Sequence, residues 1–400
     1  MNVQVRSVIA FGCLLATARV SHAQRSDAPA GWADFVRTFD AYCQADSVVG
    51  ASALVVRDGR VVAWHNRAMA DRERAERVDS STIFHWGSIT KTLTAVSIMQ
   101  LRDRGRLTLD DRVTNYLPEL RQVHNPFGSM DGITIRMLLS HSAGFQDPTW
   151  PWDTGADWEP FEPTRWEQLV AMMPYQRIHF APGSRYGYSN PAFIYLARII
   201  EQLSGDPWSH YVQKNILTPL GLTRSYFGGT PYHLERHRSN NYTVRDDSSG
   251  RIRVTANGRD FDPGITIPNG GWNAPLGDLA TYAAFLTNAS LGDSSRARRF
   301  DVVLRRSSLE EMWRPVVPYG GSEGKSGDGM GLSFFIHPRG ESTIIGHTGS
   351  QAGFRAFLYI NPKTRDAMIA AYNTSNESRS AADAAALGIL EQARTLLAQR

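Results

Sequence analysis

The stretch Phe84-His85-Trp86-Gly87-Ser88-Ile89-Thr90-Lys91, followed by an apolar run to Leu101, is the most informative part of this chain. From Ser88 to Leu101 the apolar residues surround most of a helical wheel, and Gly105 then favours a helix end. A helix that is apolar nearly all round belongs inside a protein. Ser88 and Lys91, three residues apart, are therefore predicted to lie on one face of a buried helix.

The spacing of Ser88 and Lys91 suits nucleophilic chemistry. Lysine is rare in this chain, with four lysines against 39 arginines. A buried amine loses hydration, which lowers its pKa and lets it accept a proton from a serine hydroxyl. Free N–H groups at a helix start also favour an oxyanion beside the serine. The structural alternative is that Ser88 only caps the helix while Lys91 extends to solvent, and the pair alone does not decide between them.

A second candidate segment is Tyr188-Ser189-Asn190, which precedes Pro191 and a predicted helix over residues 192–200. Asn190 suits the N-cap of that helix, with proline at the first helical position. A phenol becomes a usable base when it is held beside a lysine ammonium. Tyr188 is therefore a candidate base, although the whole segment also has an ordinary reading as a loop and a helix cap.

The third candidate segment, His347-Thr348-Gly349-Ser350, follows a predicted strand over residues 342–345. Glycine on both sides of His347 and Thr348 would let a substrate lie against the strand edge, where these two residues could donate hydrogen bonds to a carboxylate. The alternative is a polar strand end with a turn. A second Ser-x-x-Lys match, Ser322 to Lys325, lies in a glycine-rich stretch without a helical pattern.

Strands are predicted at both ends of the chain. Residues 49–56 and 60–64 are joined by Arg57-Asp58-Gly59, a strong hairpin signal, and residues 331–337, 342–345, 354–360 and 366–372 follow as an antiparallel meander. Helical patterns lie between them and at residues 381–399. We predict an α/β fold in which an antiparallel sheet, flanked by N- and C-terminal helices, carries an inserted, mostly helical domain. Residues 24–81 and 301–400 are predicted to form the two parts of the α/β domain, and residues 82–300 the mostly helical domain.

Length and composition fit a globular protein. The chain has 400 residues, of which 42% are hydrophobic and 20% charged, and its formal net charge is +4. This composition excludes wholesale disorder and a disulfide-stapled miniprotein, and it does not suggest a nucleic-acid partner. No apolar run reaches the roughly 18 residues that a membrane-spanning helix needs.

Residues 1–23 are predicted to be an export signal, because Arg6 precedes an apolar stretch that ends in Ser21-His22-Ala23. A buried N-terminal helix is the alternative. We expect an exported protein, periplasmic or secreted, in which Cys43 stands alone. Its helical surroundings favour a buried structural cysteine over a nucleophile.

The ordered set Ser88-x-x-Lys91, Tyr188-x-Asn190 and His347-Thr348-Gly349 resembles the three motifs of the serine β-lactamase and penicillin-recognising family. The resemblance is to the class C-like branch, with its D-Ala-D-Ala carboxypeptidase and esterase relatives. The Phe84–Gly87 and Leu138–Phe145 segments add to it. Where class C β-lactamases usually carry Lys-Thr-Gly, this chain has His347, and a neutral histidine attracts a substrate carboxylate less than lysine does.

The resemblance implies a serine hydrolase that acts on a β-lactam, a D-Ala-D-Ala peptide or a short ester through a Ser88 acyl-enzyme. Lys91 and Tyr188 would share the base work, and Asn190 would orient the substrate. His347, Thr348 and Gly349 would line the substrate site. The N–H groups of Ser88 and Ser350 would form the oxyanion hole.

Two other functions compete with this hypothesis. A non-catalytic penicillin-binding or sensor-type protein of the same fold would bind or be acylated without turnover. Metal chemistry is disfavoured, because His233-Leu234-Glu235-Arg236-His237 lacks the His-Glu-x-x-His order, so we expect no metal and no cofactor. The expected partner is a small-molecule or peptide substrate, and the sequence leaves the oligomeric state open.

Overall fold

The computed structural model describes residues 28–145, 162–247, 249–319, 327–376 and 380–399. The predicted export signal and the second Ser-x-x-Lys match lie outside these residues. Among the described helices, none is both long and apolar enough to cross a membrane.

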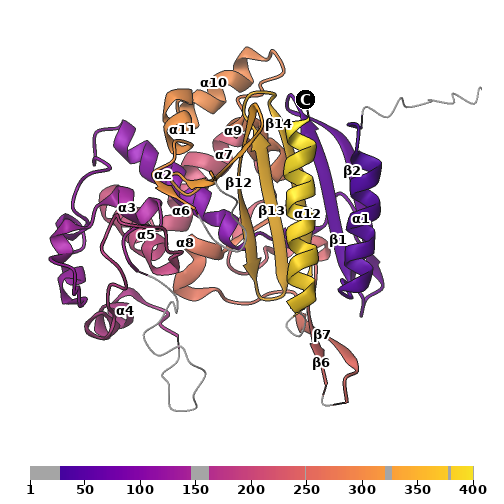
Figure 1. The fold of residues 1–400 in the computed structure, drawn as a ribbon, viewed down its shortest axis with the longest axis horizontal. Helices are drawn as coiled ribbons and strands as arrows, with labels where there is room; N and C mark the ends of the chain where they lie inside the picture. Colours follow the sequence, from indigo (N-terminus) through magenta and orange to yellow (C-terminus); the bar gives the residue numbers. More distant parts are fainter. Residues whose placement is uncertain (1–27, 146–161, 248, 320–326, 377–379, 400) are drawn as a thin grey trace, which may run out of the picture.

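The described part is built on a nine-stranded antiparallel sheet that takes strands from both ends of the chain (Figure 1). Its strands, in spatial order, are β3 (Glu76–Arg77), β2 (Arg60–Asp71), β1 (Gly50–Arg57), β14 (Asp366–Tyr372), β13 (Phe354–Asn361), β12 (Ser342–Gln351), β11 (Phe335–Arg339), β10 (Gly329–Met330) and β9 (Val317–Pro318). Pairing of β1 with β14 joins the N-terminal hairpin to the C-terminal meander.

Two small sheets complete the strands described. One contains β15 (Thr374–Asn376), β6 (Asn241–Asp246) and β7 (Ile252–Gly258). The other contains β4 (Ile83–His85), β8 (Trp272–Pro275) and β5 (Tyr226–Phe227), and it lies next to the first candidate motif in the chain.

Helices cover both faces of the large sheet. Their bounds are α1 (Trp32–Ala45), α2 (Thr90–Asp103), α3 (Ile135–Leu139), α4 (Trp166–Met172), α5 (Asn190–Ser204), α6 (Trp208–Val212), α7 (Thr218–Leu220), α8 (Ile267–Gly270), α9 (Leu276–Leu286), α10 (Ser294–Val303), α11 (Arg306–Met312) and α12 (Ser380–Ala398). In Figure 1, α1 and α12 lie against one side of the sheet, while the helices from α2 to α8 form a separate layer.

Side-chain alternation along the strands explains this arrangement. Ala53 and Val55 of β1 pack with Phe35 and Phe39 of α1 in one apolar cluster, whereas Leu54 belongs to the larger cluster on the other face. Successive side chains of a strand point to opposite faces, so strands that are apolar throughout need a cover on both sides. The predicted α/β fold, with its antiparallel sheet and flanking helices, is confirmed.

The hairpin signal is also confirmed in detail. Asp58 and Gly59 have φ values of 44° and 81°, and Arg57 pairs with Arg60 across the turn. Two consecutive positive φ values define the turn type that Asp-Gly favours between strands. Cys43 is fully buried within α1, and burial raises the pKa of its thiol, which agrees with a structural role.

Three local predictions were wrong. The chain over residues 331–334 forms a turn, so the first strand of the meander begins at Phe335 rather than at Gly331. β12 runs on to Gln351, because β13 pairs with it along the whole third motif. The helix predicted from Ser88 starts as a 3-10 turn over Gly87–Ile89 and becomes α-helical at Thr90.

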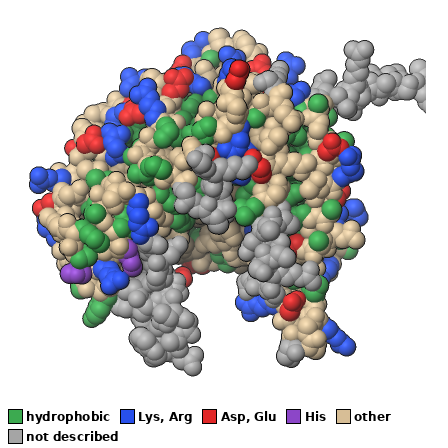
Figure 2. Space-filling model, viewed as in Figure 1, with side chains coloured by type: hydrophobic (Ala, Val, Ile, Leu, Met, Phe, Trp, Pro, Cys, Tyr) green, Lys and Arg blue, Asp and Glu red, His purple; other side chains and the backbone are tan. Residues whose placement is uncertain are grey.

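The surface carries mixed charge. On the face shown in Figure 2, Lys and Arg side chains alternate with Asp and Glu side chains over the helical layer.

The domain boundaries at residues 81 and 300 stay predictions. Helix α11 begins after residue 300, yet it lies in contact with α2 of the predicted helical domain.

Candidate active site

The turn that carries Ser88 is fixed by the short sheet before it. β4 pairs with β8, and the Trp86 N–H donates to the Trp272 carbonyl oxygen over 2.8 Å. Gly87 then takes a φ of 48° and directs the chain into α2. Ser88 stands at this junction with its side chain partly exposed, at the end where helical N–H groups have no intrahelical acceptor.

Lys91 does not extend to solvent. Its side chain is completely buried, and Nζ donates to Ser88 Oγ at 3.0 Å, Asn190 Oδ1 at 2.8 Å and the Asn269 carbonyl oxygen at 2.8 Å. Three elements therefore meet at one amine: the start of α2, the start of α5 and the end of α8. The structural alternative for this pair, a solvent-directed lysine, is excluded.

These three partners suit an amine that changes its protonation state. An ammonium has three N–H donors, and all three acceptors can be used. After the loss of one proton, the two amide oxygens of Asn190 and Asn269 can keep their N–H donors. The lone pair can then accept the proton of the Ser88 hydroxyl. The geometry thus fits both the resting ammonium and the active base.

Tyr188 and Asn190 approach Lys91 from the α5 side. The Lys91 Nζ lies 4.9 Å from the centre of the Tyr188 ring. Asn269 Nδ2 also donates to Asn190 Oδ1, over 3.3 Å. Asn190 Oδ1 thus accepts hydrogen bonds from both Lys91 and Asn269. The structure brings these two predicted residues to the same amine as Ser88.

The prediction that Asn190 caps α5 was wrong. Ser189 is the N-cap, and its hydroxyl oxygen accepts the Ala192 N–H at 3.2 Å. Both side chains are typical caps, so the sequence could not separate them. Because Asn190 does not cap the helix, its side-chain amide can point toward Lys91.

The third motif faces the Ser88 turn across two glycines. A Cβ atom added to Gly349 would lie 2.0 Å from the Trp86 carbonyl oxygen and 3.4 Å from the Ser88 nitrogen. A Cβ atom added to Gly87 would lie 2.8 Å from the Ser350 nitrogen. The backbones of the two segments therefore lie in direct contact, which places the amide groups of Ser88 and Ser350 on facing chains, as an oxyanion hole needs.

The open edge of β12 is confined to this motif. β11 pairs with β12 only as far as Gly346, while β13 continues to pair as far as Gln351. Thr348 is half-buried and Ser350 is exposed in this part of the strand. The strand edge beside Ser88 is therefore not paired with β11, and the expectation that a substrate lies along it stays a prediction.

The structure places the side chain of His347 in the interior, next to the open strand edge. Its ring is 1% exposed and lies 5.0 Å from the Phe335 ring, centre to centre. Nδ1 contacts the Thr348 carbonyl oxygen, so this nitrogen carries the hydrogen and Nε2 is an acceptor. Burial, followed by the charge of Lys91, lowers the pKa of His347 to about 3. The imidazole is therefore neutral at physiological pH.

Replacement of Gly349 by alanine is expected to separate the third motif from the Ser88 turn, because the new methyl group would clash with the backbone at Trp86. We expect kcat to fall roughly 10- to 100-fold, since a misplacement of about 1 Å at a reacting centre can cost on the order of 100-fold. Steady-state kinetics and thermal unfolding check this. Gly277→Ala on α9, where an added Cβ meets nothing within 4 Å, is the matched control and should leave kcat unchanged. Equal kinetics in both variants would contradict the close approach.

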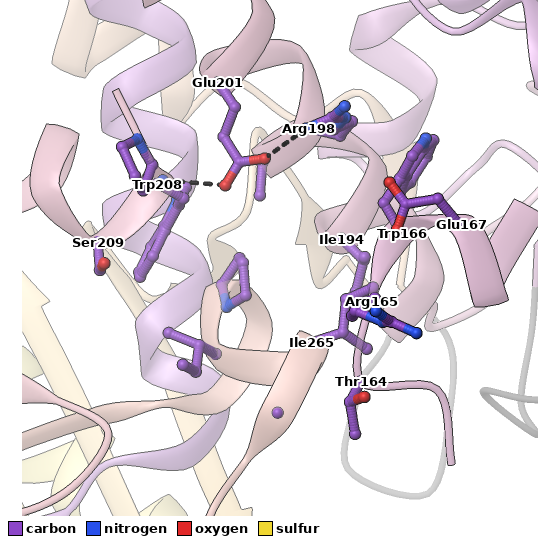
Figure 3. A pocket seen from close by; sticks show the side chains of 15 residues that line it. Thr164, Arg165, Trp166, Glu167, Ile194, Arg198, Glu201, Trp208, Ser209 and Ile265 are labelled. Carbon is purple, nitrogen blue, oxygen red and sulfur yellow. Dashed lines mark hydrogen bonds and ion pairs between the residues drawn. The ribbon is translucent and has the colours of Figure 1, made fainter. Parts of the chain in front are cut away.

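A separate pocket of about 370 Å³ lies among α4, α5, α6 and α8 (Figure 3). Pro268, next to Asn269, lines it, but Ser88, Lys91 and Tyr188 do not. In Figure 3, Glu201 lies between Arg198 and Trp208 and accepts a hydrogen bond from each, at 3.2 and 3.1 Å. The charges of Arg198 and Glu201, both half-buried, are thus paired with each other. The pocket is a neighbour of the candidate active site rather than part of it.

Two residues of the site were not predicted as such. Asn269 contributes only its backbone carbonyl oxygen, and no side-chain pattern can reveal a backbone contact. His141 stacks on the Tyr188 ring, with the ring centres 4.5 Å apart. The sequence did hold one indication for His141. It is a histidine just after the helix that became α3, at a position where glycine or asparagine is usual.

Comparisons with known proteins show similarity over most of this chain. The family model described as Beta-lactamase matches residues 35–393. Protein flp of Staphylococcus aureus (strain COL) is 22% identical over 84% of this chain and 61% of its own length. Esterase EstB of Burkholderia gladioli is 30% identical over 58% of this chain and 64% of its own length. This chain thus spans a little over three fifths of the length of these two relatives.

A solved structure is also similar, the octameric penicillin-binding protein homologue from Pyrococcus abyssi. It superposes with a TM-score of 0.71 and 26% identity, over 90% of this chain and 77% of the other. The family match covers most of the chain, including all three candidate motifs. The chain therefore belongs to the Beta-lactamase family.

Proposed function

We propose that this protein is a serine hydrolase that cleaves an ester or amide through a Ser88 acyl-enzyme. The observation that carries the proposal is the buried Lys91 amine, which joins Ser88 Oγ to Asn190 Oδ1 and the Asn269 carbonyl oxygen. Nζ lies 3.0 Å from Ser88 Oγ, which is the hydrogen-bond contact that a nucleophile and its base need.

The proposed reaction has two steps. In the first, Ser88 Oγ attacks the carbonyl carbon while its proton passes to the Lys91 amine or the Tyr188 phenolate, and the leaving group departs with a proton returned from this base. In the second, a water molecule attacks the acyl carbon, gives a proton to the same base, and releases the acid and the Ser88 hydroxyl. The amides of Ser88 and Ser350 would stabilise the oxyanion in both steps.

We propose short, uncharged esters as the preferred substrates. The buried, neutral His347 offers no cation to a substrate carboxylate, so an anionic β-lactam or a D-Ala-D-Ala peptide gains little from this position. The match to Esterase EstB also supports an ester substrate.

A substrate panel tests the proposal and the role of position 347 together. The panel contains nitrophenyl acetate and butyrate, a chromogenic cephalosporin and a D-Ala-D-Ala peptide. We expect wild-type protein to turn over the nitrophenyl esters fastest. His347→Lys adds a cation, so we expect kcat/KM for the cephalosporin to rise about tenfold, as one favourable charge contact can provide.

Two results would contradict this proposal. Stable labelling by a fluorescent penicillin, without turnover of any substrate on the panel, would favour the non-catalytic, penicillin-binding alternative. An unchanged cephalosporin rate in His347→Lys would contradict the reason given for the preference for uncharged esters, because position 347 would then not face the substrate carboxylate.

A further inference from the structure

His141 occupies a backbone position that histidine rarely takes. It follows α3 with a φ of 54°, and the Ser142 N–H closes the helix end by donating to the Met137 carbonyl oxygen over 2.9 Å. The left-handed region is uncommon for residues other than glycine, and Asn, Asp and His enter it most often. Glycine or asparagine would end the helix at least as well, so the helix end alone does not explain this histidine.

His141 contacts the segment Gly187–Ser189, with Tyr188 at its centre, at three points. The Gly187 N–H donates to the His141 carbonyl oxygen over 2.8 Å, and the Ser189 N–H donates to His141 Nδ1 over 3.0 Å. These are the backbone donors on either side of Tyr188. Between them the imidazole stacks on the Tyr188 ring, with an angle of 23° between the planes. His141 thus contacts the backbone on both sides of Tyr188 as well as its ring.

The imidazole must be neutral to make these contacts. Nδ1 accepts a hydrogen bond, so the hydrogen is on Nε2, which is buried and has no hydrogen-bond partner within the described residues. Lys91, Tyr186, Tyr188, Phe193 and His347 face the ring. Burial first, and then the charge of Lys91, lower the pKa of His141 well below its ordinary value.

Stability alone would not favour this arrangement. A buried N–H without an acceptor costs about 1–3 kcal/mol, and the left-handed backbone adds to that cost. Departures of this kind from local preference are expected where a residue serves a site. The contacts of His141 point to Tyr188 as the part of the site that it serves.

We propose that His141 is a positioning residue that holds the Tyr188 phenol beside Lys91 during hydrolysis. The inference rests on the proposed function, because it assigns Tyr188 a share in proton transfer. Tyr188 lies in a loop without regular structure before α5, so its own backbone does not fix the ring. Since the Lys91 Nζ lies only 4.9 Å from the ring centre, the position of the ring determines how far the phenol is from the amine.

Two substitutions separate the contacts of His141. His141→Asn suits a positive φ and places an amide oxygen near the position of Nδ1, but removes the stacked ring. His141→Phe keeps a ring and removes the acceptor of the Ser189 N–H. We expect His141→Asn to lower kcat at least tenfold with KM within about twofold, because the loss concerns the transition state. We expect His141→Phe to lower kcat less, provided that it folds.

His65→Asn is the matched control. His65 packs against Phe39 and hydrogen-bonds Asp40 on the face of the sheet covered by α1, away from Ser88. It should change the melting temperature without changing kcat. A His141→Asn variant with wild-type kcat and a lowered melting temperature would overturn the proposal, since His141 would then be structural only.

A double-mutant cycle with Tyr188→Phe gives the decisive comparison. If His141 acts through the phenol, adding His141→Asn to Tyr188→Phe should cause no further loss of kcat beyond about twofold. The proposal would be overturned if the fold-losses of kcat in the two single variants multiplied in the double variant, or if Tyr188→Phe kept the wild-type kcat. Failure of the proposed function has a different result, because wild-type protein would then not turn over any substrate on the panel.

Discussion

Replacement of Ser88 by alanine is expected to abolish hydrolysis, lowering kcat by at least about 10⁴-fold, because removal of a serine nucleophile eliminates the acyl-enzyme route. The Ser88 hydroxyl is partly exposed beside the amine that would activate it, 3.0 Å from Lys91 Nζ. Its loss leaves Lys91 two amide oxygens as acceptors, so the fold should persist. We expect the melting temperature to change by less than about 2 °C, because roughly 1 kcal/mol shifts the melting temperature of a chain of this length by about 1–2 °C.

Intact-mass measurement with a slow ester substrate checks the same assignment directly. Wild-type protein should gain the mass of one acyl group, and Ser88→Ala should gain none. Ser97→Ala is the matched control, because Ser97 lies on the same helix but donates its hydroxyl to the Leu93 carbonyl oxygen. It should keep both activity and adduct. Hydrolysis or acylation retained by Ser88→Ala would refute Ser88 as the nucleophile.

The parts of the fold that the sequence predicted well depend on local signals. The Asp58-Gly59 turn was predictable because its two positive φ values are a property of two adjacent residues. The buried α2 was predictable because its apolar residues surround the helix. The interior position of Lys91 follows from that pattern, since no side of α2 near Lys91 faces solvent.

The parts that could not be predicted depend on contacts between distant segments. β12 extends through the third motif because β13 supplies hydrogen-bond partners as far as Gln351, and the polar sequence of the motif gives no sign of this pairing. The Asn269 carbonyl oxygen reaches Lys91 only after α8 packs beside α2. From the sequence, His347 was predicted to donate a hydrogen bond to a substrate. In the structure its ring is buried against Phe335, and the imidazole is neutral, with Nε2 as an acceptor.

Lys91→Met is expected to lower kcat by about 10² to 10⁴-fold, the range typical of a general base. Methionine keeps most of the side-chain volume and removes the amine, so the loss should reflect proton transfer rather than collapse of the helix. The variant also leaves the amide oxygens of Asn190 and Asn269 without this donor in the interior. We therefore expect a lower melting temperature as well, since each unmet buried group costs about 1–3 kcal/mol.

Kinetics and stability need to be separated for this variant, and one lysine elsewhere in the chain is a control for both. Lys214→Met removes a lysine that is exposed and paired with Asp206 at 2.9 Å, so it should change neither kcat nor stability appreciably. Lys91→Met at a temperature where it is fully folded reports on catalysis alone. A loss smaller than about 100-fold there would shift the base role to Tyr188. In that case Lys91 would act mainly as the positive charge that holds Ser88, Asn190 and α8 together, and Lys91→Met should lose far more stability than Ser88→Ala.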